Sequence, residues 1–382
     1  MYRDPISEAK YIQSMSEVES NKIALFVYNL EHGGAEKVST LLCNELFSRN
    51  FEVELWVINY RETSLSKELN KQVPIVNLNK KHTRNAFFPL LKTIWKRKPE
   101  SILVFHTELA ILVFLVKKIF FIKRKVIVRN INTLSHFFQN SGNVLRNFIT
   151  SKLTELALKD CHKIVAQSKG MCEDLVKSFN IDSNKIETIF NPALTIGSIT
   201  KDNHEQKKLE NEFLYVGRLN AQKGLTYLLR AFAIALRTNS NLHLTIVGEG
   251  EEEPQLKTLV KELGLTLQVS FEGFQTSTIS YYLRAKATVL TSLFEGFPNV
   301  LVESISLGTP VIAFDCPSGP KDIIVQEVNG ILVEHKNIIE FAKALLRVAN
   351  NDVMFKKSNI IDSASKFSVE STVTKYVKLL TA

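Results

Sequence analysis

The chain has 382 residues, which is enough for two domains of ordinary size. A hydrophobic content of 45% and a charged content of 23% are typical of a soluble globular protein, and the net charge of +9 is unevenly placed along the chain. The first twenty residues are polar, which argues against a secretion signal, and the longest apolar run of the basic region, residues 110–116, is far shorter than the roughly 20 residues that a membrane-spanning helix needs. The cysteines form no C-x-x-C pair and no metal spacing, so we expect buried, reduced thiols of a cytoplasmic protein at Cys43, Cys161, Cys172 and Cys316.

Short apolar segments alternate with helical segments from Lys22 onward, the pattern of parallel sheets covered by helices. In the first half, the predicted strands are Ile23–Tyr28, Glu52–Ile58, Ser101–Phe105, Val126–Arg129 and Lys163–Ala166. The predicted helices there are Ala35–Arg49 and Lys169–Phe179. We assign residues 1–20 to a polar tail and residues 21–192 to a first domain with a doubly wound sheet.

The middle of this first domain is strongly basic. Residues 71–130 contain 14 Lys and Arg against two acidic residues. Large apolar residues are interleaved with the cations, a composition typical of a surface that lies on anionic lipid. We predict membrane-binding residues at Lys117, Lys118, Lys123, Arg124 and Lys125. The alternatives are a solvated face with ordinary core residues between the charges, or a nucleic-acid surface, for which no recognised motif is present.

A polar, charged stretch, residues 193–211, predicts a linker. The second alternation follows it, with strands predicted at Phe213–Val216, Leu242–Val247, Val269–Phe271, Thr288–Thr291 and Val311–Phe314. Helices are predicted at Leu225–Arg237, Pro254–Leu263, Val300–Leu307 and, in the tail, Ser368–Leu380. We assign residues 212–365 to a second domain and residues 366–382 to a C-terminal helix. Two doubly wound sheets that face each other leave a cleft at the carboxyl ends of their strands.

The most informative segment is residues 291–320, TSLFEGFPNVLVESISLGTPVIAFDCPSGP. Glu295 and Glu303 stand eight positions apart, the first in a loop after a predicted strand and the second on the following helix. Pro298 can open that helix, and Gly308 can end it. The free N–H groups at the helix N-terminus form an anion site, beside which one carboxylate can bind ribose hydroxyls and the other can face a sugar ring.

These residues resemble the E-x7-E signature of retaining glycosyltransferases of family four, which have two Rossmann-like domains in the GT-B arrangement. His32-Gly33-Gly34-Ala35-Glu36 is similar to the first glycine loop of that family. Tyr215-Val216-Gly217-Arg218-Leu219, followed by Lys223-Gly224, is similar to its diphosphate-binding arginine and lysine. The resemblance covers nearly the whole chain, and the three motifs occur in the order and spacing of the family.

The resemblance implies a role for each matching residue. Glu303 would bind the ribose, Glu295 the donor sugar, and Arg218 and Lys223 the charge on the leaving diphosphate. Gly33 and Gly34 would let the backbone approach that diphosphate. The rest of the implied donor site consists of Phe274 at the nucleobase, together with Gly296, Phe297, Pro298, Asn299 and Val300. Each of these residues also has an ordinary structural interpretation, as a surface cation, a solvated helix position or a tight turn.

Two further features of the sequence concern a metal ion and an acid–base group in the predicted site. The sequence contains no D-x-D motif, so we expect cationic side chains to act in place of a metal and no cofactor beyond the nucleotide sugar. The resemblance places a catalytic histidine at His106. A second family histidine is missing from Val128-Arg129-Asn130-Ile131-Asn132, where His136 could compensate. Lone histidines are often structural.

The resemblance as a whole implies a metal-independent, retaining hexosyltransferase. It would move a sugar from a nucleotide donor, expected to be UDP-linked, to a lipid-linked or membrane-proximal glycan in surface-polysaccharide or glycolipid synthesis. We expect it in the cytoplasm, at the inner face of the plasma membrane, with no nucleic-acid partner. Two alternatives stay open: a sugar-nucleotide 2-epimerase of the same fold, and a non-catalytic partner subunit that binds the nucleotide sugar.

Overall fold

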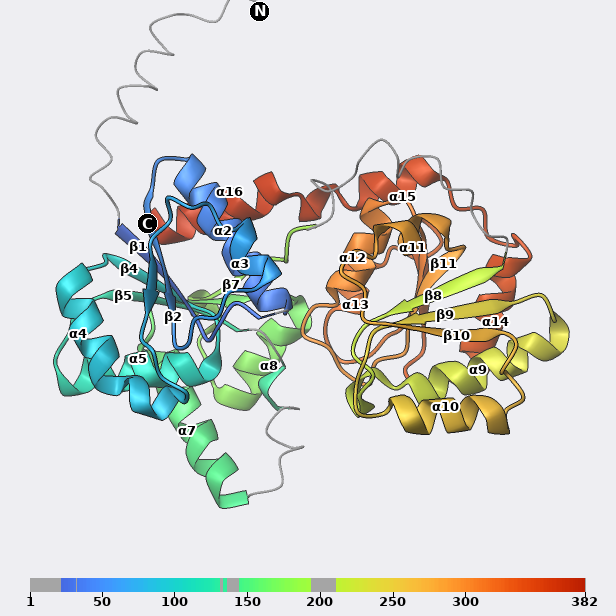
Figure 1. Ribbon diagram of the computed structural model, residues 1–382, viewed down its shortest axis with the longest axis horizontal. Coiled ribbons are helices and arrows are strands. Elements are labelled where there is room, and N and C mark those ends of the chain that lie inside the picture. Colours follow the sequence, from blue (N-terminus) through green and yellow to red (C-terminus); the bar gives the residue numbers. More distant parts are fainter. Residues whose placement is uncertain (1–21, 32, 131–132, 136–143, 194–210, 382) are drawn as a thin grey trace, which may run out of the picture.

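The computed structural model describes residues 22–31, 33–130, 133–135, 144–193 and 211–381. Two sheets lie side by side, each with its own layers of helices, and the chain completes the first before it enters the second (Figure 1). All the strand pairs within both sheets are parallel. The predicted α/β architecture of two Rossmann-like, doubly wound sheets is confirmed.

The first sheet has the strand order β3-β2-β1-β4-β5-β6-β7. Its strands are β1 Lys22–Val27, β2 Glu52–Val57, β3 Ile75–Asn77, β4 Ser101–Val104, β5 Lys125–Arg129, β6 Lys163–Ala166 and β7 Ile186–Thr188. Its helices are α2 Gly34–Ser48, α3 Ser64–Glu68, α4 Phe87–Arg97, α5 Thr107–Ile119, α7 Val144–Asp160 and α8 Lys169–Phe179, with short 3-10 turns η1 Thr83–Ala86 and η2 Ser183–Lys185. The order reverses direction at β1, which is the topological switch point of a doubly wound sheet.

The second sheet has the strand order β10-β9-β8-β11-β12-β13. Its strands are β8 Glu212–Val216, β9 His243–Val247, β10 Val269–Gly273, β11 Ala287–Leu290, β12 Val311–Phe314 and β13 Gly330–Val333. Its helices are α9 Leu225–Thr238, α10 Glu253–Glu262, α11 Ile279–Arg284, α12 Asn299–Ser306, α13 Pro320–Ile323, α14 Ile338–Ala349 and α15 Lys357–Ser363, with 3-10 turns η5 Ala221–Lys223 and η6 Ser365–Phe367. The switch point here falls between β8 and β11, so the loops that follow these two strands border the site described below.

The central strands are continuous apolar runs in the sequence because both of their faces are buried. The central strands have helices on both faces, and β1, β4 and β11 are buried along almost their whole length. Two apolar clusters fill the two sides of the first sheet, and a third, larger one packs α9, α12 and α14 against the second sheet. Within the described residues, no helix is long and apolar enough to cross a membrane.

The last helix, α16 Val369–Thr381, crosses back to the first domain and lies beside α2 (Figure 1). Its apolar face joins the core of the first sheet through Val373, Tyr376 and Leu380. Two polar contacts fix its ends: Arg49 pairs with Glu370 at 2.6 Å, and Lys125 Nζ donates to the carbonyl of Leu380 at 3.1 Å. The C-terminal helix is therefore part of the first domain's packing.

Candidate functional site

The two domains meet where the strands of both sheets end. Thr133, which follows β5, donates its hydroxyl hydrogen to the carbonyl oxygen of Glu295 at 2.8 Å. The hydroxyl oxygens of Ser168 and Ser318 are 2.5 Å apart, and the Lys169 N–H donates to Asp322 at 2.8 Å. These residues lie in loops or helix starts at the carboxyl ends of strands, so these ends of the two sheets face each other and are in direct contact, as expected for two facing doubly wound sheets.

Glu295 lies where the two domains meet, as one half of a buried ion pair. Its Oε1 accepts from Lys223 Nζ at 2.6 Å and from the Ser292 hydroxyl at 2.6 Å. The side chain of Glu295 is 7% exposed and that of Lys223 is 19% exposed. Gly224 takes the left-handed φ of +59° that lets the chain turn from η5 into α9, and a side chain there would collide with the backbone of Thr291. Lys223 and Glu295 were predicted from separate motifs, and this ion pair brings them into direct contact.

Helix α12 presents its N-terminus to the first domain. The helix begins at Asn299, and Pro298 is its N-cap, so Pro298 stands one position earlier than predicted. A Cβ on Gly34, at the start of α2, would lie 2.8 Å from the Asn299 side-chain nitrogen. The glycine loop and the N-terminus of α12 thus approach each other across the cleft, and the missing side chain at Gly34 permits it. Of the other residues around this helix start, Gly296 and Phe297 are buried and Val300 is half-buried.

Glu303 lies one turn into α12 and is half-buried. Its Oε2 accepts from the Tyr282 hydroxyl at 2.9 Å. Burial, together with the neighbouring Glu303 carboxylate, raises the pKa of Tyr282 well above its ordinary value, so this hydroxyl stays a donor. The carboxylate is held by one partner and keeps further acceptor capacity for a ligand.

Arg218 and Phe274 lie at the outer rim. Arg218 follows β8 and is exposed; its guanidinium has no ion pair within the described residues, and its carbonyl accepts from the Tyr215 hydroxyl at 2.9 Å. Phe274 follows β10, is 51% exposed, and donates its backbone N–H to Glu249 Oε1 at 3.2 Å. The structure does not bring Arg218 into contact with Glu295 or Lys223 through any described interaction.

His106 is the N-cap of α5 and points toward α2. Its Nε2 lies 3.5 Å from Glu36 Oε1, and its Nδ1 is buried without a hydrogen-bond partner in the described part of the chain. Burial opposes ionisation of Glu36, but the hydrogen bond and the charge of His106 outweigh it and lower the Glu36 pKa below its ordinary value. Gly33, the N-cap of α2, lies beside Glu36. His136, the suggested replacement for the missing histidine, and His32 lie outside the described residues.

Sequence reasoning missed a buried polar bridge between the domains. Arg129 is 1% exposed, stacks over Phe105, and donates from Nη2 to Asn191 Oδ1 at 2.6 Å. Asn191 in turn donates to Asn299 Oδ1 at 2.8 Å, at the start of α12. Arg129 Nε and Nη1 and both polar side-chain atoms of Asn130 are buried and unpaired among the described residues. Unpaired buried polar atoms at a cleft are suited to a ligand. The signal in the sequence was an Arg-Asn pair at the carboxyl end of an apolar strand.

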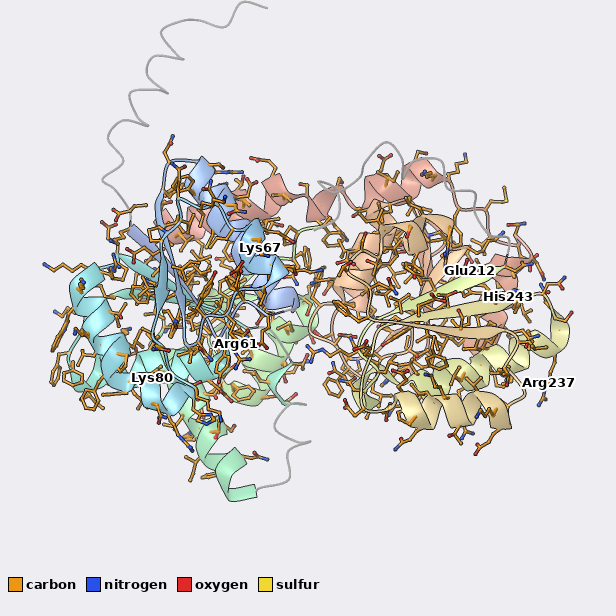
Figure 2. The ribbon with its side chains drawn as sticks, in the orientation of Figure 1. Arg61, Lys67, Lys80, Glu212, Arg237 and His243 are labelled. Carbon is orange, nitrogen blue, oxygen red and sulfur yellow. The ribbon has the colours of Figure 1, made fainter. Side chains whose placement is uncertain are left out.

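Two further observations delimit the site. Within the part of the chain that the structure describes, no group of three His, Cys, Asp or Glu residues could hold a metal ion. A pocket of about 600 Å³ lies at the opposite end of β8, β9 and β10, beside Glu212 and His243, on the side away from the first domain (Figure 2). It is therefore not the interdomain cleft.

Comparison with known proteins agrees with this geometry. The family described as glycosyl transferases group 1 matches residues 198–367, and the family described as Glycosyltransferase Family 4 matches residues 32–193. A 4-alpha-N-acetylgalactosaminyltransferase of Campylobacter jejuni, which acts on N-acetylgalactosamine-N,N'-diacetylbacillosaminyl-diphospho-undecaprenol, is 30% identical over 88% of this chain and 92% of its own length. The chain belongs to the group 1 glycosyltransferases. The group 1 match contains both cleft glutamates, and the Family 4 match contains the glycine loop and His106.

Other similar proteins are also glycosyltransferases. The lipopolysaccharide 1,6-galactosyltransferase of Salmonella typhimurium is 32% identical over 53% of this chain and 56% of its own length. Among solved structures, TarM superposes with a TM-score of 0.80 at 14% identity, covering 96% of this chain and 99% of TarM. The HepE protein of Anabaena, solved with UDP and glucose, gives 0.77 at 16% identity over 94% of this chain and 99% of HepE. At these identities the structures establish the shared GT-B fold of this glycosyltransferase.

Proposed function

We propose that this glycosyltransferase transfers a sugar, with retention of anomeric configuration, from a UDP-linked donor to a lipid-linked glycan of the bacterial surface. The observation that carries the proposal is the juxtaposition of Lys223, Glu295 and the N-terminus of α12, with Glu303 one turn further along that helix. A nucleoside diphosphate needs N–H donors and a cation at its phosphates and a carboxylate at its ribose, and this cleft supplies all three.

Each side chain then has a defined task. The backbone N–H groups of Asn299 and Val300 donate to the diphosphate, while Lys223 and Arg218 balance the charge that grows on the leaving phosphate oxygen. Glu303 binds the ribose hydroxyls, and Phe274 lies against the nucleobase. Glu295 orients the donor sugar and holds Lys223 in place. His106, steadied by Glu36, faces the reacting sugar from the first domain. Arg218 is exposed, so its role requires the side chain to swing inward when the donor binds.

The acceptor class rests on the relatives. The Campylobacter jejuni relative acts on a diphospho-undecaprenol-linked sugar, and the Salmonella relative acts on lipopolysaccharide. Transfer to a lipid-linked or membrane-proximal glycan in surface-polysaccharide or glycolipid synthesis is the corresponding activity for this chain. Both of these relatives are named as transferases, which favours this function over the epimerase and over the non-catalytic partner.

Association with an anionic membrane is the second part of the proposal. Phe88, Trp95, Ile119 and Phe121 leave 71%, 57%, 55% and 89% of their surface exposed, around α4 and the end of α5. Helix α4 lies on the side of the first domain away from the second domain (Figure 1). Aromatic rings among cations are typical of a surface that rests on the inner face of a plasma membrane.

The five predicted membrane residues do not contribute equally. Lys117 is largely buried and pairs with Asp160 at 3.0 Å, and Lys125 is half-buried against the carbonyl of Leu380. Lys118 and Lys123 are exposed, and Arg124 is partly exposed. Lys117 and Lys125 hold the local structure, so contact with the lipid falls to the other three and to the exposed apolar side chains.

The donor site is tested by Glu303→Ala. Losing a charge-assisted hydrogen bond to the ribose should cost about 1.5–3 kcal/mol, which is roughly a 10- to 150-fold increase in the Kd for UDP. Titration calorimetry measures this. Glu262→Ala, an exposed carboxylate on α10, is the matched control and should bind UDP as the parent does. Unchanged UDP affinity in the Glu303 variant would remove the proposed ribose contact.

Metal independence is tested on the same site. Arg218→Ala should lower kcat more than it raises KM for the donor, because its charge acts on the leaving diphosphate as the bond breaks. Chelation by EDTA should leave the kcat of the parent unchanged, since cationic side chains take the place of a metal. A strict requirement for a divalent cation would count against the assignment of Arg218 and Lys223.

The epimerase alternative is tested by incubation with donor alone, without acceptor. This should give no epimerised sugar nucleotide.

A further inference from the structure

A basic pocket of about 440 Å³ lies outside the interdomain cleft, at the amino-terminal edge of the first sheet. It lies between the end of α5, the segment leading into β5, the turn between α7 and β6, and η2. The side chains that line it are Lys117, Lys123, Arg124, Lys125, Asp160, Cys161, His162 and Lys185. Its volume is within the range of small-ligand sites.

The charges in this pocket do not balance. Five cations face one carboxylate, which leaves a net charge of +4 with His162 neutral. Asp160 is already engaged by Lys117 at 3.0 Å and by Lys118, outside the lining, at 2.6 Å. Lys125 donates to the carbonyl of Leu380, and Lys185 donates to the carbonyls of Lys159 and Cys161, which carry no net charge.

The remaining two cations are free to bind a ligand. Neither Lys123 nor Arg124 has a carboxylate within 4.0 Å among the residues that the structure describes. Burial and four nearby lysines, Lys125 among them, lower the pKa of His162 below its ordinary value. Burial also lowers the pKa of Lys125. The lysine contribution to the His162 shift is consistent with a positive potential in this pocket.

Two exposed apolar side chains lie within two residues of the pocket's lining in the sequence. Phe121, two residues before Lys123, leaves 89% of its surface exposed and takes a left-handed φ of 50°, which is unfavourable for a bulky residue. Ile119, at the end of α5, leaves 55% exposed. A lipid-binding site needs apolar side chains for the acyl region and cations for the headgroup, and both kinds of side chain occur here.

We propose that this pocket binds the phosphomonoester headgroup of an anionic lipid, with Phe121 and Ile119 entering the membrane beside it. This inference rests on the proposed membrane association and adds a preference among anionic lipids. A monoester phosphate carries between one and two negative charges near neutral pH and three acceptor oxygens, whereas a diester headgroup such as that of phosphatidylglycerol carries one charge. Several converging cations therefore favour the monoester.

The experiment compares vesicles of phosphatidylcholine doped with phosphatidic acid or with phosphatidylglycerol, adjusted to equal surface potential. Co-sedimentation of the full chain should be several-fold stronger on phosphatidic acid. Lys123→Gln combined with Arg124→Gln should reduce this preference to about one. The matched control, Lys92→Gln combined with Lys96→Gln on exposed positions of α4, removes two cations outside the pocket. It should weaken binding to both vesicles by similar factors and keep the preference.

Each outcome separates the two proposals. If the parent binds neither anionic vesicle, the membrane association itself is wrong. If it binds both equally at matched potential, the membrane association stands and the headgroup pocket is overturned. Inorganic phosphate as a soluble probe distinguishes the source: binding of phosphate without a preference for phosphatidic acid would identify a free-anion site and overturn the lipid assignment. Lys185→Gln, which changes the opposite wall, should also abolish the preference, and thermal melting checks that each variant is folded.

Discussion

Lys223 and Glu295 connect donor chemistry to stability. The pair lies near the contact between the domains, with a 2.6 Å separation and little exposure of either side chain. A carboxylate taken out of water is tolerated only when it is paired and hydrogen-bonded, and Lys223 and Ser292 meet both needs. A loss of activity in Lys223 variants can therefore come from lost structure as well as from lost charge at the diphosphate.

We predict that Lys223→Ala destabilises the protein, because it leaves the Glu295 carboxylate without its cation. The cost should be about 2–3 kcal/mol, below the value for a fully buried pair since the Lys223 ammonium still reaches solvent. Thermal melting at neutral pH measures this. Lys223→Met combined with Glu295→Gln removes both charges and should recover most of the lost stability. Equal melting temperatures for Lys223→Ala and the parent would show that the pair contributes nothing to stability.

At the level of residues, the sequence motifs identified more of the interacting polar side chains in the second domain than in the first. Glu295 and Lys223 come from two motifs 72 positions apart, and their contact follows from the facing loops of a doubly wound sheet. Arg129, Asn130 and Asn191 carried no motif, because a buried arginine or asparagine is recognised only when its partners are known. Their unpaired atoms became visible only in three dimensions.

At the level of helices and strands, the buried elements were easier to predict from the sequence than the elements at the edges and on the surface. The central strands of both sheets are continuous apolar runs, and the sequence located every one of them. The edge strands β3, β7 and β13 are three or four residues long, and the sequence alone did not identify them. Helices α4 and α5 were interpreted as a basic surface rather than as helices. Their cations and exposed aromatics obscured the apolar stripe formed by residues such as Leu90, Ile94 and Val113.

Asn191 joins the first sheet to helix α12, and we predict that Asn191→Ala weakens both stability and donor binding. The substitution leaves the buried Arg129 without its Nη2 acceptor, a loss of about 1–3 kcal/mol, and releases Asn299 at the N-terminus of α12. Melting temperature and the KM for the donor should both change. Asn184→Ala, in η2 at the other end of β7, is the control and should leave KM unchanged. A stable Asn191 variant with the parent's KM would show that the bridge is not needed to position α12.

At the level of the whole molecule, the first domain is built from two separate parts of the chain. The second domain is complete in sequence before α16 begins, yet α16 belongs to the core of the first domain. The core of the first domain therefore includes the apolar face of α16. The Arg129–Asn191–Asn299 bridge and the Thr133–Glu295 contact connect the two domains at the carboxyl ends of their strands.

We predict that Tyr376→Ala destabilises the first domain selectively. Tyr376 is 1% exposed in the core between α16 and the first sheet, and truncating a buried aromatic ring should cost about 3–5 kcal/mol. Lys378→Ala, an exposed position two residues along the same helix, is the control and should melt as the parent does. Hydrogen exchange locates the effect: amides of β1, β2 and α2 should exchange faster in the Tyr376 variant, whereas those of β8, β11 and β12 should keep the parent's rates. Faster exchange confined to the second sheet, or in both sheets equally, would mean that α16 does not stabilise the first domain in particular.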